Sequence, residues 1–131
     1  MAIDTERLNT IVQAFVTETP HVQGAALVTH EGLPIASTLP QGLEESRAAA
    51  MAAAVMTIGD RIGEDLQRGT MQHIMLLGSH GYSLLTTCGS EALFLVLASS
   101  EVKQGILMIE IQRVVEEAAA VIDAKATRYD D

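Results

Sequence analysis

The sequence is poor in cysteine, basic residues and aromatic residues. These shortages exclude an internal disulfide, argue against nucleic-acid partners and rule out a core built from aromatic residues. Cys88 is the single cysteine, so no internal disulfide can form, which suits a reducing compartment. The 8 basic side chains stand against 17 acidic ones, giving a net charge of −9. Because a negative net charge of this size repels the phosphate backbone of nucleic acids, we expect no nucleic acid among the partners.

Long apolar runs are also missing. No uninterrupted apolar run reaches about 18 residues, so we expect no membrane-spanning segment. The first residues, Met1–Glu6, contain neither a basic region nor an apolar region, so we expect no secretion signal and a cytoplasmic location. With two phenylalanines, two tyrosines and no tryptophan, the core must consist of aliphatic residues and methionine.

The residues that are present predict one folded domain. Apolar residues make up 48% of the 131 positions, which excludes disorder for the body of the chain. This length favours a single domain over residues 1–131. Within it we expect a core at 4–123 and a frayed acidic tail at 127–131.

Apolar periodicity and turn residues predict three helices and five strands in the order αββαβββα. Asp4 is a suitable N-cap for the first helix, and Ser100 for the last. Gly32 and Gly69 are expected to supply positive φ at a hairpin turn and at a helix end. The predicted helices span 4–18, 43–68 and 102–125, and the predicted strands span 25–30, 33–38, 71–77, 82–87 and 92–98.

Proline and the apolar pattern predict the order of the strands. Pro34 has no N–H for a ladder, so strand 33–38 is expected at a sheet edge. Strand 92–98 reads ALFLVLA without alternation, so it is expected at the centre with both faces covered. With hairpin pairing, these positions predict an α+β fold. It has one five-stranded antiparallel sheet of order 2-1-5-4-3, with helices on both faces.

The other edge strand and the second helix predict a homodimer. Strand 71–77 has no proline or lysine to guard its edge. Helix 43–68 reads AAAMAAAVM from Ala48 to Met56, apolar all round, so we expect it to be covered on more than one side. A solvated alanine surface is the alternative, because alanine is a strong helix former. The expected interface residues are Ala48, Met51, Ala52, Val55, Met56, Gly59, His73 and Met75.

No group of side chains has the spacing of a catalytic or metal site. The four histidines form no HxH pair and no pair three or four residues apart. Cys88 is expected in a turn without a neighbouring base, and the Ser79-His80 pair has no carboxylate to orient it. No glycine pattern forms a phosphate-binding loop. We therefore expect no enzyme, no metal and no cofactor.

Three stretches resemble the Roadblock/dynein-light-chain family over about residues 4–123. They are the hairpin AALVTHEGLPIAS at 25–37, the long alanine-rich second helix, and the segment from Gly81 to Ile122. The resemblance implies a profilin-like or longin-like fold that dimerises through the second helix and the third strand. Family members are non-catalytic platforms or regulators of small Ras-like GTPases. Some are adaptors on dynein or on lysosomal signalling complexes.

The chain looks more like the prokaryotic members, of which the gliding-motility type activates a polarity GTPase. The resemblance thus implies a homodimeric regulator that binds a Ras-like GTPase, with GTPase activation as one mode. An adaptor in a signalling or motility complex, without GTPase contact, is the alternative. A small-ligand sensor is disfavoured, because the core lacks polar residues to orient a ligand.

A docked GTPase is expected to lie across the paired second helices. The polar positions available there are Glu44, Arg47, Asp60, Arg61, Glu64 and Gln67. The alternative role for the arginines is in ion pairs along the helix, such as Glu64–Arg68.

Overall fold

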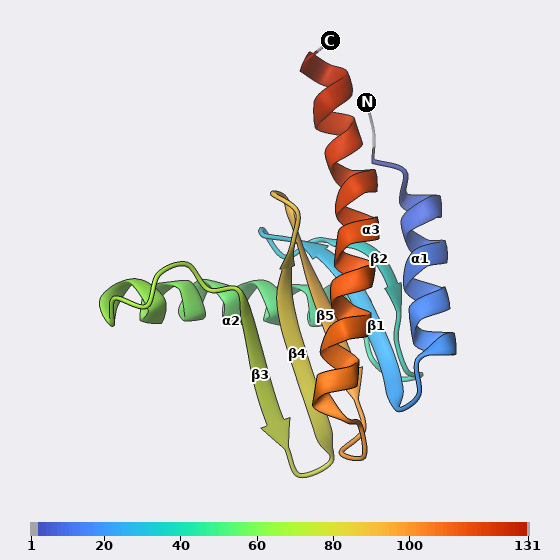
Figure 1. Cartoon of the computed structure of the whole chain (residues 1–131), viewed down its shortest axis with the longest axis vertical. Coiled ribbons are helices and arrows are strands. Elements are labelled where there is room, and N and C mark those ends of the chain that lie inside the picture. Colours follow the sequence, from blue (N-terminus) through green and yellow to red (C-terminus); the bar gives the residue numbers. More distant parts are fainter. Residues whose placement is uncertain (1–2, 131) are drawn as a thin grey trace.

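The computed structural model describes the backbone of residues 3–130 and the side chains of 3–124, and its elements follow the predicted order (Figure 1). The helices are α1 (Thr5–Glu18), α2 (Glu45–Asp65) and α3 (Gln104–Asp130). The strands are β1 (Val22–Thr29), β2 (Pro34–Thr38), β3 (His73–Gly78), β4 (Gly81–Cys88) and β5 (Ala92–Ala98). Helix α3 continues to Asp130, beyond its predicted end at 125, and Asp131 lies outside the described residues.

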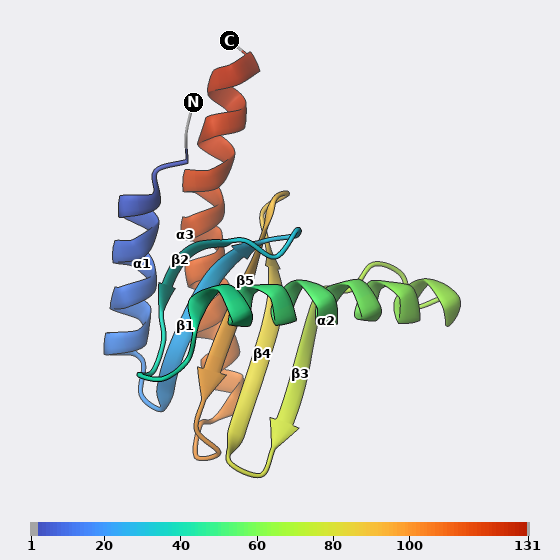
Figure 2. The same ribbon diagram turned by 180° about the vertical axis from the view of Figure 1, so that it is seen from behind.

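The strands form one antiparallel sheet of order β2-β1-β5-β4-β3, as predicted. Helices α1 and α3 lie on one face, and α2 crosses the other (Figures 1 and 2). The larger core lies under α1 and α3, where Phe15 and Phe94 meet edge to face at 5.4 Å. The smaller core lies under α2 and includes Met56, Leu85 and Leu93. The central strand β5 therefore packs on both faces.

Helix α2 is shorter than predicted at both ends. It begins at Glu45 rather than Leu43, where the Glu45 carboxylate accepts a hydrogen bond from Ser37 Oγ at the end of β2. It ends at Asp65, because the N–H groups of Arg68 and Gly69 donate to Gly63 O at 2.6 and 3.1 Å and fold the chain back. Gly69 has the expected positive φ, at +88°.

Smaller differences occur at other element ends. Strand β1 begins at Val22 rather than Ala25, and β3 begins at His73 rather than Met71. Helix α3 begins at Gln104. Ser99 Oγ, rather than the expected Ser100, accepts the Glu101 N–H at 3.3 Å in the turn before it. The Asp4 cap on α1 is as predicted, since its side chain accepts the Arg7 N–H at 3.1 Å.

The two edges of the sheet differ in how they are protected. Strand β2 begins with Pro34, and the Ser37 N–H donates to Asn9 Oδ1 on α1 at 3.3 Å. In the described part of the chain, the backbone of β3 is hydrogen-bonded to β4 only. The β2 edge is thus closed by a proline and by α1, whereas the β3 edge is open to another strand.

A methyl group at Gly63 should destabilise the fold. Its Cβ would lie 2.2 Å from Gly69 O, in the backbone that turns back after α2. We expect Gly63→Ala to lower the free energy of unfolding by about 1–3 kcal/mol in urea titrations.

Gly105→Ala is the matched control, because nothing lies within 4 Å of a Cβ at that α3 position. This variant should gain about 0.5–1 kcal/mol from helix propensity. Equal effects of the two substitutions would contradict the close approach at Gly63.

Candidate functional site

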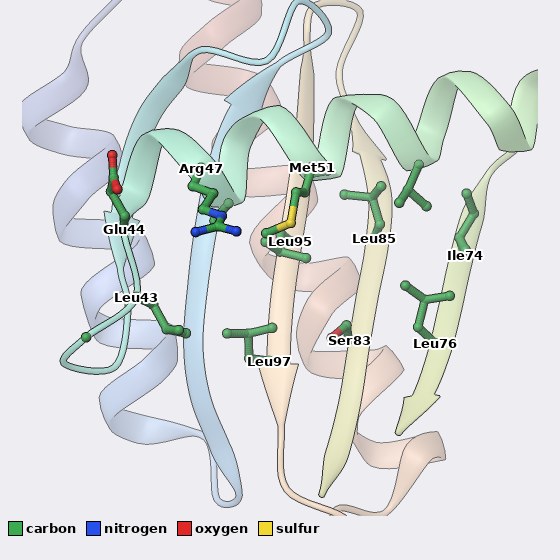
Figure 3. Close-up of a pocket in the computed structure, with 14 residues that line it drawn as sticks. Leu43, Glu44, Arg47, Met51, Ile74, Leu76, Ser83, Leu85, Leu95 and Leu97 are labelled. Atoms are coloured by element: carbon green, nitrogen blue, oxygen red, sulfur yellow. The ribbon is translucent and has the colours of Figure 1, made fainter. Parts of the chain in front are cut away.

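A groove of about 600 Å³ lies beside α2, on the face of the sheet that this helix crosses (Figure 3). It exists because α2 covers only part of that face and leaves the remainder of β3, β4 and β5 open (Figure 2). The floor consists of leucines and an isoleucine with one serine, and the polar side chains of the wall belong to Glu44 and Arg47. The lining residues are Gly42, Leu43, Glu44, Arg47, Ala48, Met51, Ala52, Val55, Ile74, Leu76, Ser83, Leu85, Leu95 and Leu97.

One side of α2 exposes large apolar residues next to this groove. Met51, Ile58, Ile62 and Leu66 are all at least half exposed, and Ile58 is 59% exposed. Together with the half-buried Val55, they recur every three or four residues and therefore lie on one side of the helix. We call these five residues the α2 stripe. Exposed apolar residues that adjoin an apolar groove are typical of a surface that binds another protein.

The predicted interface divides into residues that the chain itself buries and residues that remain accessible. Ala52, Met56 and Gly59 are buried within the chain. A Cβ at Gly59 would lie 2.6 Å from Ile74 Cδ1, so this glycine admits the chain's own strand β3 and not a second helix. The accessible members are Ala48 and Val55, both half-buried, and Met51, His73 and Met75, all exposed.

The residues that sequence reasoning missed are Ile58, Ile62, Leu66 and Leu76. The three helix residues follow Met51 and Val55 at the spacing of one helix side, and this signal was in the sequence. The spacing was not recognised because alanines occur all around the helix, so no single apolar side could be chosen. Leu76 lies in the groove beside the open edge of the sheet.

The six polar positions expected to contact a GTPase are all exposed on α2 or at its ends. Asp60 Oδ1 accepts the Met71 N–H at 3.2 Å, so it also holds the start of the β3 segment. Arg61 pairs with Asp65 at 3.3 Å, whereas the expected Glu64–Arg68 pair is not formed. Instead, Arg68 Nε donates to the carbonyl of Leu66 at 3.1 Å.

Of the remaining three positions, two line the groove and one lies just after the end of α2. Arg47 lies on the groove wall, where its guanidinium group makes no ion pair with another described residue (Figure 3). Glu44 accepts a hydrogen bond from Ser46 Oγ at 2.9 Å. Gln67 has a positive φ of 57° in the turn after α2. The structure therefore does not gather the six positions into one cluster.

Among the described residues, no group of three or more His, Cys, Asp or Glu side chains could hold a metal ion. Cys88 is the last residue of β4 rather than part of a turn, and its Sγ lies 3.7 Å from Val115 O. Burial, and secondarily the charge of Asp123, raises the pKa of Cys88 to about 12, so the thiol is neutral and inert. No helix in the described range is long and apolar enough to cross a membrane.

Comparisons with known proteins agree on one family. The model of the Roadblock/LC7 domain matches residues 8–98. The uncharacterized protein MJ1340 of Methanocaldococcus jannaschii is 30% identical over 106 residues, which cover 81% of this chain and 92% of that protein.

Solved structures agree on the fold. The Roadblock/LC7 domain from Streptomyces avermitilis has a TM-score of 0.81 at 20% identity, covering 87% of this chain and 96% of that one. MglB of Myxococcus xanthus has a TM-score of 0.86 at 14% identity, covering 95% and 93%. Profilin IA of Acanthamoeba castellanii has a TM-score of 0.60 at 13% identity, covering 86% and 96%, so the expected profilin-like fold is confirmed.

The stability of the protein should decrease in alkali because of Cys88. The folded chain holds its thiol proton up to a pKa of about 12, whereas the unfolded chain releases it above the ordinary value of 9.0. Folding thus favours the protonated form, and its contribution is complete below pH 9 and is lost as the pH rises. We expect the free energy of unfolding to fall by about 1.4 kcal/mol per pH unit between pH 9 and 12. Urea titrations of Cys88→Ala, which should lack this component of the slope, provide the control.

Proposed function

Because this chain belongs to the Roadblock/LC7 domain family, we propose that it is a cytoplasmic, non-catalytic homodimer that regulates, or forms a platform for, a small Ras-like GTPase. The observation that carries the proposal is the apolar stripe of α2 beside the open edge of β3. A monomer would leave both exposed to water. We infer that the partner is a GTPase from the resemblance to this family, because its members regulate such enzymes without catalytic residues of their own.

Strand pairing between two copies is supported by the contrast between the edges. Pro34 and the Asn9–Ser37 hydrogen bond close the β2 edge, whereas β3 has neither proline nor lysine. Antiparallel pairing of two β3 strands around a two-fold axis would join the sheets into one of ten strands. The same axis makes the interface isologous, so each surface must complement itself.

The α2 stripe has this self-complementarity. If two α2 helices lie antiparallel, an axis between Ile58 and Ile62 sets Ile58 against Ile62 of the second copy. The same register sets Val55 opposite Asp65 of the second copy, next to Leu66. The contacts at Ile58 and Ile62 are apolar, so one alignment buries the centre of the stripe.

The length of α2 explains how the groove would be covered. With 21 residues, α2 is about 32 Å long. Five strands span four intervals of about 4.8 Å, or about 19 Å. The helix therefore projects beyond β3 (Figure 2). In the proposed dimer, this projecting end would lie over the open part of the second sheet, near Leu76.

The paired helices would leave their polar sides outward as the surface for a GTPase. Arg47, Arg61 and Glu64 are exposed and lie outside the stripe, so they remain the contact positions we propose. The net charge of −9 favours a basic surface on the GTPase.

A charge in the stripe should abolish the dimer. We expect Ile58→Asp to shift sedimentation at micromolar concentration from dimer to monomer, because the dimer would have to bury an unpaired carboxylate. Since Ile58 is 59% exposed in the single chain, the fold itself should persist by circular dichroism.

Ala54→Asp adds the same charge to an exposed position of α2 outside the stripe, and it should remain dimeric. A wild-type chain that sediments as a monomer, or an Ile58→Asp variant that sediments as a dimer, would refute this interface.

GTPase binding can be tested by pull-down from native lysate loaded with GDP or with a non-hydrolysable GTP analogue. We expect a Ras-like GTPase, identified by mass spectrometry, to be retained mainly in the GTP-like state. The triple variant Arg47→Ala, Arg61→Ala, Glu64→Ala should retain about tenfold less, while Arg113→Ala on α3 should not differ from wild type. If both nucleotide states give the same partners without a GTPase, the chain is an adaptor. GTP hydrolysis by the protein alone would contradict the non-catalytic proposal.

A further inference from the structure

Strand β3 exposes apolar residues on the face that α2 does not cover. Ile74 packs into the core under α2, so alternation along the strand directs Met75 and Leu77 to the α1/α3 face. There Met75 is 38% exposed and Leu77 is 69% exposed, because α3 packs against β4 and leaves β3 bare (Figure 1). A strand that is apolar on both faces is typical of a strand covered on both faces. One cover is α2, and the second is missing.

The proposed dimer, on which this inference rests, would not supply that second cover. Pairing of the β3 edges would bring two copies of Met75 and Leu77 together at the middle of the joined sheet. The two α3 helices would then stand on either side of them. We infer that this surface, a trough with β3 strands as its floor and α3 helices as its walls, binds one amphipathic α-helix of a partner protein per dimer.

The width of the trough suits one helix. Each α3 packs against β4 and covers the core side of β5. From β4 to the symmetry-related β4 is three strand intervals, and from β5 to β5 is five, or about 14 and 24 Å. One helix between two others needs two interaxial distances of 8–10 Å, or about 16–20 Å in all. A single helix fits this range.

The negative charge of α3 and of the whole chain indicates which kind of partner helix would bind in the trough. Between residues 104 and 124, α3 carries four acidic side chains and one basic one, and each chain has a net charge of −9. A second copy of the dimer would bring like charges together. The helix that fits has an apolar side for Met75 and Leu77 and basic residues along its flanks.

The test uses a synthetic 18-residue helix of leucine and lysine with all leucines on one side, titrated calorimetrically into the protein at 0.15 M salt. We expect one peptide per dimer, and binding about tenfold weaker for Leu77→Ser. Leu33→Ser is the matched control, since Leu33 is 63% exposed in the turn between β1 and β2, at the opposite side of the sheet from β3, and this variant should bind like wild type. A scrambled peptide of the same composition measures attraction by charge alone.

Each other outcome overturns the inference. Binding of one or more peptides per chain, equal binding of the scrambled peptide, or no effect of Leu77→Ser would each show that no such trough is used. Sedimentation of the same samples separates this failure from failure of the proposed function. A dimer that binds no helix refutes the trough alone, whereas a monomer refutes both.

Discussion

The close approach of α2 to its own sheet is the constraint on which the other surfaces depend. Gly59 and Gly63 bring the helix so near to Ile74 and to the turn at Gly69 that an added Cβ at either would collide. Because the small side of α2 is used inside the chain, the larger apolar residues must lie on another side. The α2 stripe and the groove beside it follow from that orientation.

The exposure of the β3 edge is informative because the β2 edge of the same sheet is protected. Both edges of an open sheet present unpaired backbone groups, and β2 is closed by Pro34 and by the Asn9 side chain. Strand β3 has no such protection and carries apolar residues on both faces. An edge that is open, apolar and adjacent to an exposed helix stripe is better explained by association than by solvation.

The fold could be predicted from the sequence because its signals are local and strong. Pro34 marked one edge, the unbroken apolar run of β5 marked the centre, and hairpin spacing ordered the rest. The sides of α2 could not be predicted, because alanines around the helix leave its apolar direction undefined. Gly59 was assigned to a second helix, although it admits Ile74 of the same chain. The end of α2 depends on hydrogen bonds to Gly63 O, which sequence periodicity does not report.

Among the described side chains, from residue 3 to 124, the most distinctive features are exposed apolar surfaces rather than a cluster of titratable groups. Cys88 is buried with a raised pKa, and the six exposed polar positions around α2 do not form a cluster. What the chain offers instead is one apolar face on each side of β3 within an acidic exterior. In the proposed complexes, apolar contact would supply the affinity, while the negative charge would discriminate against acidic partners. Because β3 belongs to both faces, its pairing would determine whether either surface is complete.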